Sequence, residues 1–189
     1  MMRLLFIIGL LCYGLGNLVA PSPRSHWSGS PVGKVCSLIL YGRGEVAWHW
    51  GENPREHENN EPESQEEGGD PKDPHNPALL RTIQLLEYAH HCDPSFYSPT
   101  FDLASLLAYR QNNPEAARQL LEESIPQVIT MKEKISLQFI LFQILAYKMR
   151  DESEAKNILQ IIRAEYQEHS QEIEPSLQKM IEDTLKKYL

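Results

Sequence analysis

The sequence predicts an all-α fold, a short α-α solenoid of antiparallel helix hairpins preceded by a disordered acidic N-terminal segment. From Pro77 onward, apolar residues recur at helical spacing through consecutive segments. Within that region the stretch AYRQNNPEAARQLLEES, which begins at Ala108, recurs without a gap 38 positions later as AYKMRDESEAKNILQII. Residues between Glu52 and Asp73, by contrast, include no large hydrophobic side chain, so they cannot offset the entropy cost of ordering.

The first 20 residues are typical of a targeting segment. Arg3 supplies a short positively charged start, Leu4–Cys12 forms an apolar core of signal-peptide length, and small residues follow. We expect a signal peptide cleaved after Gly16 or Ala20. The alternative is an uncleaved signal anchor, because Leu4–Ala20 nearly reaches the length of a membrane span. Both predictions place the protein in the secretory pathway, either secreted or lumenal, or anchored by this segment.

Residues 21–76 are predicted to form an irregular, acidic arm of low complexity. Residues 21–31 are rich in Ser, Pro and Gly. Two β-prone runs, Val35–Tyr41 and Glu45–Trp50, then flank Gly42-Arg43-Gly44, a connection that is typical of a β-hairpin. This hairpin, within residues 35–50, would be marginal in water unless it packs on the helices. From Gly51 to Asn76 we expect a solvated linker.

Residues 77–189 are predicted to form a helical repeat domain. Asn76 is a candidate N-cap, Pro77 suits the first helical position, and Asp93-Pro94 ends the first helix. Further helices are expected at about Thr100–Gln111, Pro114–Ile129, Ile135–Met149, Glu152–His169 and Pro175–Leu189.

The internal repeat aligns residues of the same kind in equivalent positions. Asn113 and Asp151 each precede a second helix, where their side chains can accept hydrogen bonds from its free N–H groups. The same spacing aligns Phe101, Phe139 and Leu177, then Ala104, Phe142 and Met180, then Tyr109, Tyr147 and Leu185, and finally Arg110, Lys148 and Lys186. Helix pairs that recur in this way are typical of an α-solenoid, in which each hairpin buries its apolar face on its neighbour.

From about Pro77 to Leu189 the chain resembles the tetratricopeptide-repeat family. The matching residues of three successive repeats are Thr82, Leu86, Ala89 and Pro94; Phe101, Ala104, Ser105, Ala117, Leu121 and Ser124; and Phe139, Phe142, Ala155, Leu159 and Ile162. The resemblance implies a final capping helix and a concave groove lined by the first helix of each pair. The chain departs from the family in its 38-residue spacing against the usual 34, in Phe for Trp, in the missing turn glycines and in Pro126. A divergent helical repeat or bundle therefore stays open.

By the same resemblance, eight residues would face a partner in the groove: Asp102, Leu106, Tyr109, Arg110, Ile140, Ile144, Tyr147 and Lys148. Tyr and Arg are enriched at interface hot spots. Arg110, Lys148 and Lys186 would form a basic stripe in a chain whose net charge is -8. The alternative is that the two tyrosines pack between helices and that the basic groups favour the C-terminal turns of the helices.

No residue pattern points to catalysis, to a cofactor or to a metal. Neighbouring residues of His90-His91-Cys92-Asp93 project about 100° apart on a helix, so they cannot converge on one ion. The net negative charge also argues against nucleic acid as a partner. Cys36 and Cys92 remain after signal cleavage, and in an oxidising compartment they either pair as a disulfide or stay free.

The sequence therefore predicts a non-catalytic protein–protein interaction module, a scaffold or adaptor that binds a peptide or a partner helix. Its partner would be another protein, and a membrane would be involved only through an uncleaved N-terminal anchor. One alternative is a secreted helical-bundle ligand or effector that acts through an outer surface. Another is an accessory subunit of an enzyme complex.

Overall fold

The computed structural model describes residues 30–52 and 76–188, which form an all-helical fold without a strand. The predictions for residues 1–20, for residues 21–29 and for the linker at 53–75 lie outside the described residues. In chain order the helices are α2 Pro31–Glu52, α3 Pro77–Cys92, α4 Tyr97–Ser105, α5 Pro114–Ser124, α6 Met131–Gln143, α7 Glu152–His169 and α8 Pro175–Tyr188. The all-α prediction is confirmed for the described residues.

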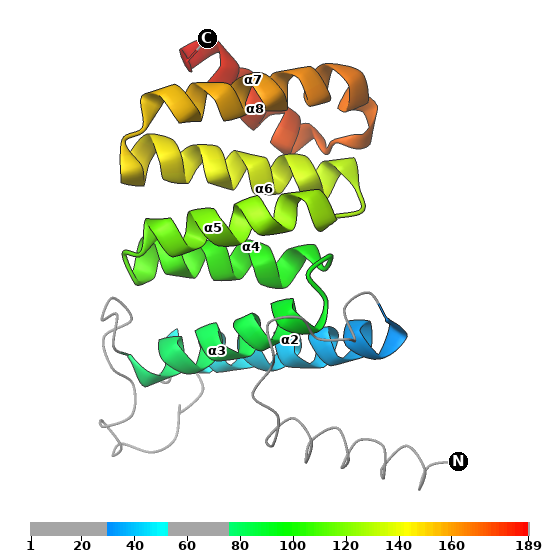
Figure 1. The fold of residues 1–189 in the computed structure, drawn as a ribbon, viewed down its shortest axis with the longest axis vertical. Coiled ribbons are helices and arrows are strands. Elements are labelled where there is room, and N and C mark those ends of the chain that lie inside the picture. The colour runs from blue at the N-terminus through cyan, green and yellow to red at the C-terminus, as the bar shows by residue number, and fades with distance from the viewer. Residues whose placement is uncertain (1–29, 53–75, 189) are drawn as a thin grey trace, which may run out of the picture.

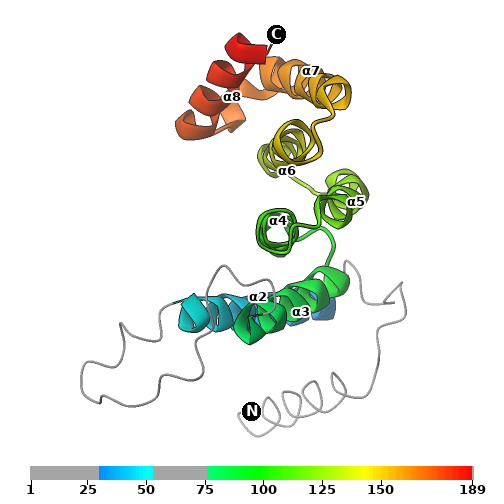
Figure 2. The same cartoon turned by 90° about the vertical axis from the view of Figure 1, so that its left-hand side faces the viewer.

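Consecutive helices lie side by side and stack in chain order, α2 beside α3, α4 beside α5, and α6 beside α7, with α8 against α7 (Figure 1). After a turn of 90°, α4, α6 and α8 lie on one side of the stack, and α5 and α7 lie on the other (Figure 2). The two views also show the axes of α2 and α3 rotated relative to those of α4, α5 and α6. The C-terminal ends of α4 and α6 and the length of α8 therefore belong to one surface.

The core consists of two clusters of buried side chains. The smaller one is built from Leu79, Ile83, Leu86 and Leu103 and joins α3 to α4. The larger one runs from α4 to α8, and its fully buried members include Phe142 and Ile181. Two partly buried leucines, Leu107 and Leu120, pack against both clusters. They connect the two parts of the stack.

The repeat reappears in the backbone at the same spacing. α4 and α6 each continue into a π-helical turn, at Leu106–Arg110 and Ile144–Met149. Each π-turn is closed by a bond to a carbonyl six residues earlier, from the Asn113 N–H to Leu107 at 2.8 Å and from the Asp151 N–H to Leu145 at 3.0 Å. The residues Asn112 and Arg150 have positive φ angles of 51° and 58°. These are positions where glycine is the usual residue.

The predicted N-caps are confirmed in the same two positions. The Asn113 side chain accepts a hydrogen bond from the Ala116 N–H, and the Asp151 side chain accepts one from the Glu154 N–H. The side chain of Asn76 accepts hydrogen bonds from the N–H groups of Ala78 and Leu79 at the start of α3. Equivalent local signals therefore start equivalent helices.

The predicted β-hairpin at residues 35–50 is wrong, because this stretch lies within the single helix α2. Gly33, Ser37 and Gly44 are buried on one face of α2, at helical spacing, and α2 lies against α3. A Cβ atom added to Gly44 would come within 3.3 Å of Leu86 Cδ2, so the glycine permits the close approach. Packing against α3 therefore overrides the β-propensity of the Val, Ile and Tyr residues.

The helix predicted at Pro114–Ile129 ends earlier than expected. α5 stops at Ser124 and gives way to a 3₁₀ turn at Ile125–Gln127. Pro126 has no N–H to donate to the carbonyl group of Glu122, so the α-helical hydrogen-bond pattern cannot continue through it. The chain can therefore turn into α6, which starts at Met131.

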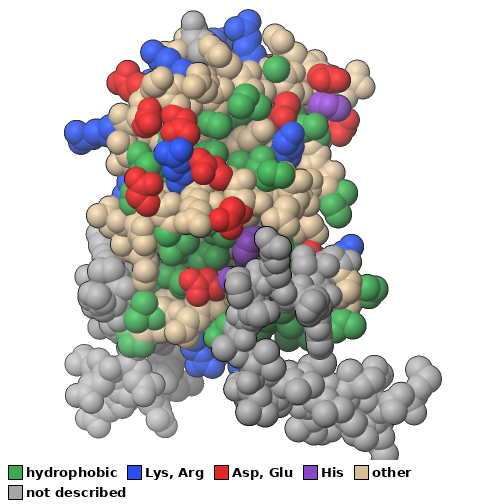
Figure 3. Space-filling model, in the orientation of Figure 1, with side chains coloured by type: hydrophobic (Ala, Val, Ile, Leu, Met, Phe, Trp, Pro, Cys, Tyr) green, Lys and Arg blue, Asp and Glu red, His purple; other side chains and the backbone are tan. Residues whose placement is uncertain are grey.

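The face of α5 and α7 carries charges of both signs. In Figure 3, acidic and basic side chains are interspersed over the helices that follow α3. Arg118 links α5 to α7 through a 2.7 Å ion pair with Glu154, and Lys134 links α6 to α7 through a 2.6 Å ion pair with Glu165. We interpret this face as a solvated exterior, since exposed ion pairs contribute little to stability.

Candidate functional site

Six of the eight predicted groove residues lie on the two π-turns. Leu106, Tyr109 and Arg110 belong to the turn after α4, and Ile144, Tyr147 and Lys148 belong to the turn after α6. The other two, Asp102 and Ile140, lie within α4 and α6. A π-turn inserts one extra residue into a helix and is frequent at functional sites, because it redirects the side chains that follow it.

The structure corrects the placement of two predicted groove residues and shows a third to be partly buried. Ile140 and Ile144 are buried in the larger core cluster, with Ile144 fully inaccessible, so neither can contact a partner at the surface. Leu106 packs against the smaller cluster. Their apolar side chains are drawn into the helix interfaces because burial of a leucine or isoleucine is worth about 1.5–3 kcal/mol.

Asp102 serves as a contact between helices. Its Oδ2 atom accepts a 3.0 Å hydrogen bond from the hydroxyl of Tyr41 on α2. Burial raises the pKa of Asp102, and the nearby Glu45 adds to this effect, while the Tyr41 bond opposes it. The Tyr41 ring also makes an edge contact with Phe96, with ring centroids 5.6 Å apart. Asp102 thus ties α2 to α4, and its carboxylate is already engaged.

Three of the predicted groove residues, Tyr109, Tyr147 and Lys148, lie close together at the surface. The side chains of Tyr109 and Tyr147 are 43% and 53% exposed. The Lys148 ammonium nitrogen lies 5.1 Å from the centre of the Tyr109 ring, in a cation–π contact that bridges the two π-turns. Arg110 is half-buried beside them.

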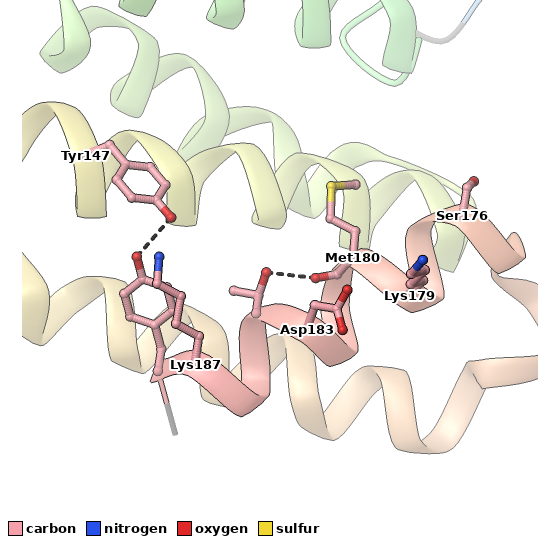
Figure 4. A pocket seen from close by; sticks show the side chains of 8 residues that line it. Tyr147, Ser176, Lys179, Met180, Asp183 and Lys187 are labelled. Carbon is pink, nitrogen blue, oxygen red and sulfur yellow. Dashed lines mark hydrogen bonds between the residues drawn. The ribbon is translucent and has the colours of Figure 1, made fainter.

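Tyr147 continues this surface onto α8. Its hydroxyl shares a 2.8 Å hydrogen bond with the hydroxyl of Tyr188 (Figure 4). Both rings make edge contacts with the buried Phe142. The Lys187 ammonium nitrogen lies 4.9 Å from the centre of the Tyr188 ring. Phe142 therefore holds both tyrosine rings from below while their hydroxyl ends stay at the surface.

Beside the tyrosine pair lies a shallow open pocket of about 420 Å³ along α8. Its lining residues are Tyr147, Ser176, Lys179, Met180, Asp183, Thr184, Lys187 and Tyr188 (Figure 4). Two ammonium groups face one carboxylate there, so the pocket carries a net positive charge within an acidic chain. We call Tyr109, Tyr147, Lys148 and this pocket together the tyrosine–lysine surface.

Sequence reasoning did not identify the pocket or Tyr188. The spacing that relates α4 and α6 to α8 aligned Met180 with the buried residues Ala104 and Phe142, yet Met180 is 44% exposed. Met180 lies in the open pocket that Tyr147 of the preceding π-turn also lines, and not in a closed helix interface. The 38-residue spacing makes α8 equivalent to α4 and α6. This equivalence could have predicted that α8 extends the surface formed by the ends of those two helices.

The four residues that end α3 project in different directions, as expected. His90 is buried, and its Nδ1 atom lies 2.9 Å from the hydroxyl of Thr100. The Nδ1 atom of His91 lies 2.6 Å from the carbonyl oxygen of Glu87. Burial lowers the pKa of His90 to about 4. Within residues 30–52 and 76–188, no group of three His, Cys, Asp or Glu side chains is placed to hold a metal ion.

Cys36 and Cys92 are brought together by the pairing of α2 with α3. Their sulfur atoms lie 2.9 Å apart, and both are free thiols in the structure. None of the helices in the described ranges combines the length and the apolarity of a bilayer span. Neither a family model, nor a curated protein, nor a solved structure matches the chain.

Proposed function

We propose that the chain is a non-catalytic protein-interaction module that binds an acidic peptide segment on its tyrosine–lysine surface. The scaffold would be a short α-solenoid of the tetratricopeptide-repeat type, with α8 as its capping helix. The observation that carries the proposal is the continuity of this surface. Tyr109 and Lys148 meet Tyr147, which in turn lines the pocket of α8.

The chemistry of the surface favours a segment that combines carboxylates with an aromatic or aliphatic anchor. Lys148, Lys179 and Lys187 supply ammonium groups, and Asp183 is the acidic side chain that lines the pocket with them. Exposed tyrosine rings offer large contact areas at a small cost in side-chain entropy, which is why tyrosine is frequent at interface hot spots. The secretory location expected from the N-terminal segment would place the partner in the same compartment.

Site-specific photo-crosslinking tests this proposal on the full chain. A photoreactive phenylalanine analogue replaces Tyr109, and the matched control carries it at Ile161 on α7, which is exposed to a similar degree at 45%. The probe is an array of acidic and basic peptides with aromatic anchors. We expect labelling at position 109 by acidic peptides, and at least about tenfold less labelling at position 161, because only position 109 belongs to the tyrosine–lysine surface.

A charge reversal then tests the role of the lysines. Lys187→Glu should weaken labelling at position 109 about tenfold, because it places a carboxylate beside the bound acidic segment. Lys156→Glu on the exposed side of α7 makes the same change of net charge and should leave labelling unaltered. Equal labelling at positions 109 and 161, or equal effects of the two reversals, would rule the proposal out.

The outer face of α2 supports a second candidate function, that of a helical ligand or accessory subunit acting through an outer surface. Five aliphatic side chains there are 51–60% exposed: Val32, Val35, Leu38, Ile39 and Val46. They lie opposite the small residues that pack toward α3. An apolar pocket of about 330 Å³ adjoins Val46 between α2 and α3. Exposed apolar area of this kind is typical of protein contact sites.

The same crosslinking series separates the two functions. The photoreactive residue at position 39 reports on the outer face of α2, and the mass of the product distinguishes a second copy of the chain from another protein. Labelling confined to position 39 would favour the second candidate over the first.

A further inference from the structure

We propose that Cys36 and Cys92 form a disulfide that locks α2 onto α3 under oxidising conditions. The two residues are 56 positions apart in the chain, yet their sulfur atoms lie 2.9 Å from each other across the interface. A disulfide bond requires about 2.05 Å. The two sulfur atoms therefore have to approach by less than about 1 Å to form the bond.

The lock matters because the buried face of α2 consists of small residues, and no large apolar side chain from residues 31–47 is fully buried. Among residues 31–47 of α2, the buried positions are Gly33, Ser37 and Gly44, and the partly buried Tyr41 packs against the smaller core cluster. The Ser37 hydroxyl is also buried without a hydrogen-bond partner. A buried polar group without a partner destabilises the interface that contains it.

Tyr41 provides further ties between α2 and the rest of the stack. They include the hydrogen bond from Tyr41 to Asp102 and the edge contact of Tyr41 with Phe96. A covalent bond between residues so far apart in sequence strongly restricts the unfolded chain, and this effect grows with loop length. The two thiols therefore lie at the interface where a covalent bond would add most to the attachment of α2.

The environment of the pair also favours exchange chemistry. The Cys92 thiol donates a hydrogen bond to the Cys36 sulfur, which lowers the pKa of Cys36 to about 7. Cys36 is therefore the attacking thiolate near neutral pH, because the thiolate is the reactive form. Both side chains are partly exposed, so a small reagent can reach them.

The oxidant is a low-molecular-weight disulfide, and the exchange proceeds in two displacements. The Cys36 thiolate attacks one sulfur of the reagent, forms a mixed disulfide with it and expels the other half as a thiolate. Cys92 then loses its proton to that thiolate, attacks the Cys36 sulfur and expels the second half. The two protein thiols are oxidised, and one reagent disulfide is reduced to two thiols.

Glutathione redox buffers applied to the full chain test the proposal. After the free thiols are blocked and the chain is digested with trypsin, the bond appears as peptide 35–43 linked to peptide 82–110. Cys12 lies in a different tryptic peptide, so it cannot produce this product. We expect the linked product to predominate when the buffer has the redox potential of an oxidising compartment. In the variant Cys36→Ser the linked product should be absent. Accumulation of the mixed glutathione disulfide in place of the linked product would overturn the proposal.

Amide hydrogen exchange tests the locking. Oxidation should slow exchange of the α2 amides by about 30- to 1,000-fold in the wild type, the range that a disulfide typically provides. In Cys36→Ser the same treatment should leave these rates unchanged. A linked product that forms without slowing exchange would refute the lock.

A thiol placed at another position of α2 tests whether the bond to Cys92 forms by random encounter. In the double variant Cys36→Ser/Ile39→Cys the thiol moves to the outer face of α2, where position 39 is 57% exposed. We expect no link to Cys92 there. A link that forms as readily as in the wild type would show that α2 does not hold Cys36 against Cys92, and the proposal would fail.

Discussion

At the scale of single residues, the neighbours in space decide what each side chain does. Tyr109 and Tyr147 occupy equivalent positions of the repeat, and both stay half-exposed at the surface. Ile144 lies three residues before Tyr147 on the same π-turn, yet it is fully buried. His90 and His91 differ in the same way, since one faces Thr100 in the interior and the other the solvent. Residue type alone therefore did not separate surface positions from packing positions.

The buried His90 makes stability depend on pH. Its pKa is about 4 in the folded chain because burial disfavours the charged ring, whereas the ordinary value is 6.5. The folded state thus binds fewer protons than the unfolded state between these values. The stabilising effect of the neutral ring is present above pH 6.5 and is lost as the pH falls toward 4, by roughly 3 kcal/mol in all.

Urea unfolding at pH 7.5 and pH 4.5 measures this dependence. The variant His90→Gln has no group that titrates at this position, so its free energy of unfolding should fall less between the two pH values than that of the wild type. The comparison within each protein removes the constant cost of the substitution. The same loss in both proteins would mean that His90 does not titrate as we infer.

At the scale of helices, local sequence signals determine where a helix begins, whereas packing can determine whether a segment is helical at all. Asn76, Asn113 and Asp151 cap α3, α5 and α7 as their types predict. The helical state of α2 has a different origin, because its sequence contains four glycines and several β-branched residues. Gly44 approaches Leu86 closely, while Gly42 has no atom of another residue near its Cβ position. Gly42 and Gly44 thus play opposite roles in the same helix.

Alanine substitutions at these two glycines separate helix propensity from packing. Gly42→Ala should raise the free energy of unfolding by about 0.5–1 kcal/mol, since alanine favours the helix and meets open space. Gly44→Ala gains the same propensity but places its Cβ atom 3.3 Å from Leu86 Cδ2, so its net effect should be clearly smaller or of opposite sign. Chemical denaturation of both variants provides the measurement. Equal stabilisation by both would contradict the close packing of α2 on α3.

At the scale of the whole molecule, the core of the stack consists of two clusters of buried side chains. The α3–α4 cluster and the α4–α8 cluster share contacts through Leu107 and Leu120. In stacked helix pairs, stability is approximately a sum of the stability of each pair and of the interfaces between neighbours. The first pair therefore depends on the second through these leucines and through the bond from Tyr41 to Asp102.

Removing the shared leucines should uncouple the two clusters. In the double variant Leu107→Ala/Leu120→Ala we expect the amides of α3 to exchange at lower denaturant concentrations than those of α6, because the interface that couples them has lost apolar contact. Ile181→Ala is the control, since this fully buried residue lies at the far end of the stack on α8. It should weaken α8 without separating α3 from α6. Parallel loss of protection in α3 and α6 of the double variant would refute the uncoupling.

The sequence by itself determined the all-helical state of residues 77–188, the caps and the register of the repeat. These follow from short-range signals, namely apolar spacing, capping side chains and prolines, which act within one or two turns of the chain. The same register pointed to Tyr109, Tyr147 and Lys148, and the structure brings these three together at the surface.

Only the tertiary structure decided the helical state of α2, the burial of Ile140 and Ile144, the pocket along α8 and the meeting of the two thiols. Each of these depends on residues that are distant in sequence. The small residues on the inner face of α2 favour the helix only when they pack against α3. Likewise, Cys36 lies near Cys92 only when the two helices are side by side. Local preference cannot encode such contacts, because their free energy appears only when both surfaces are already in place.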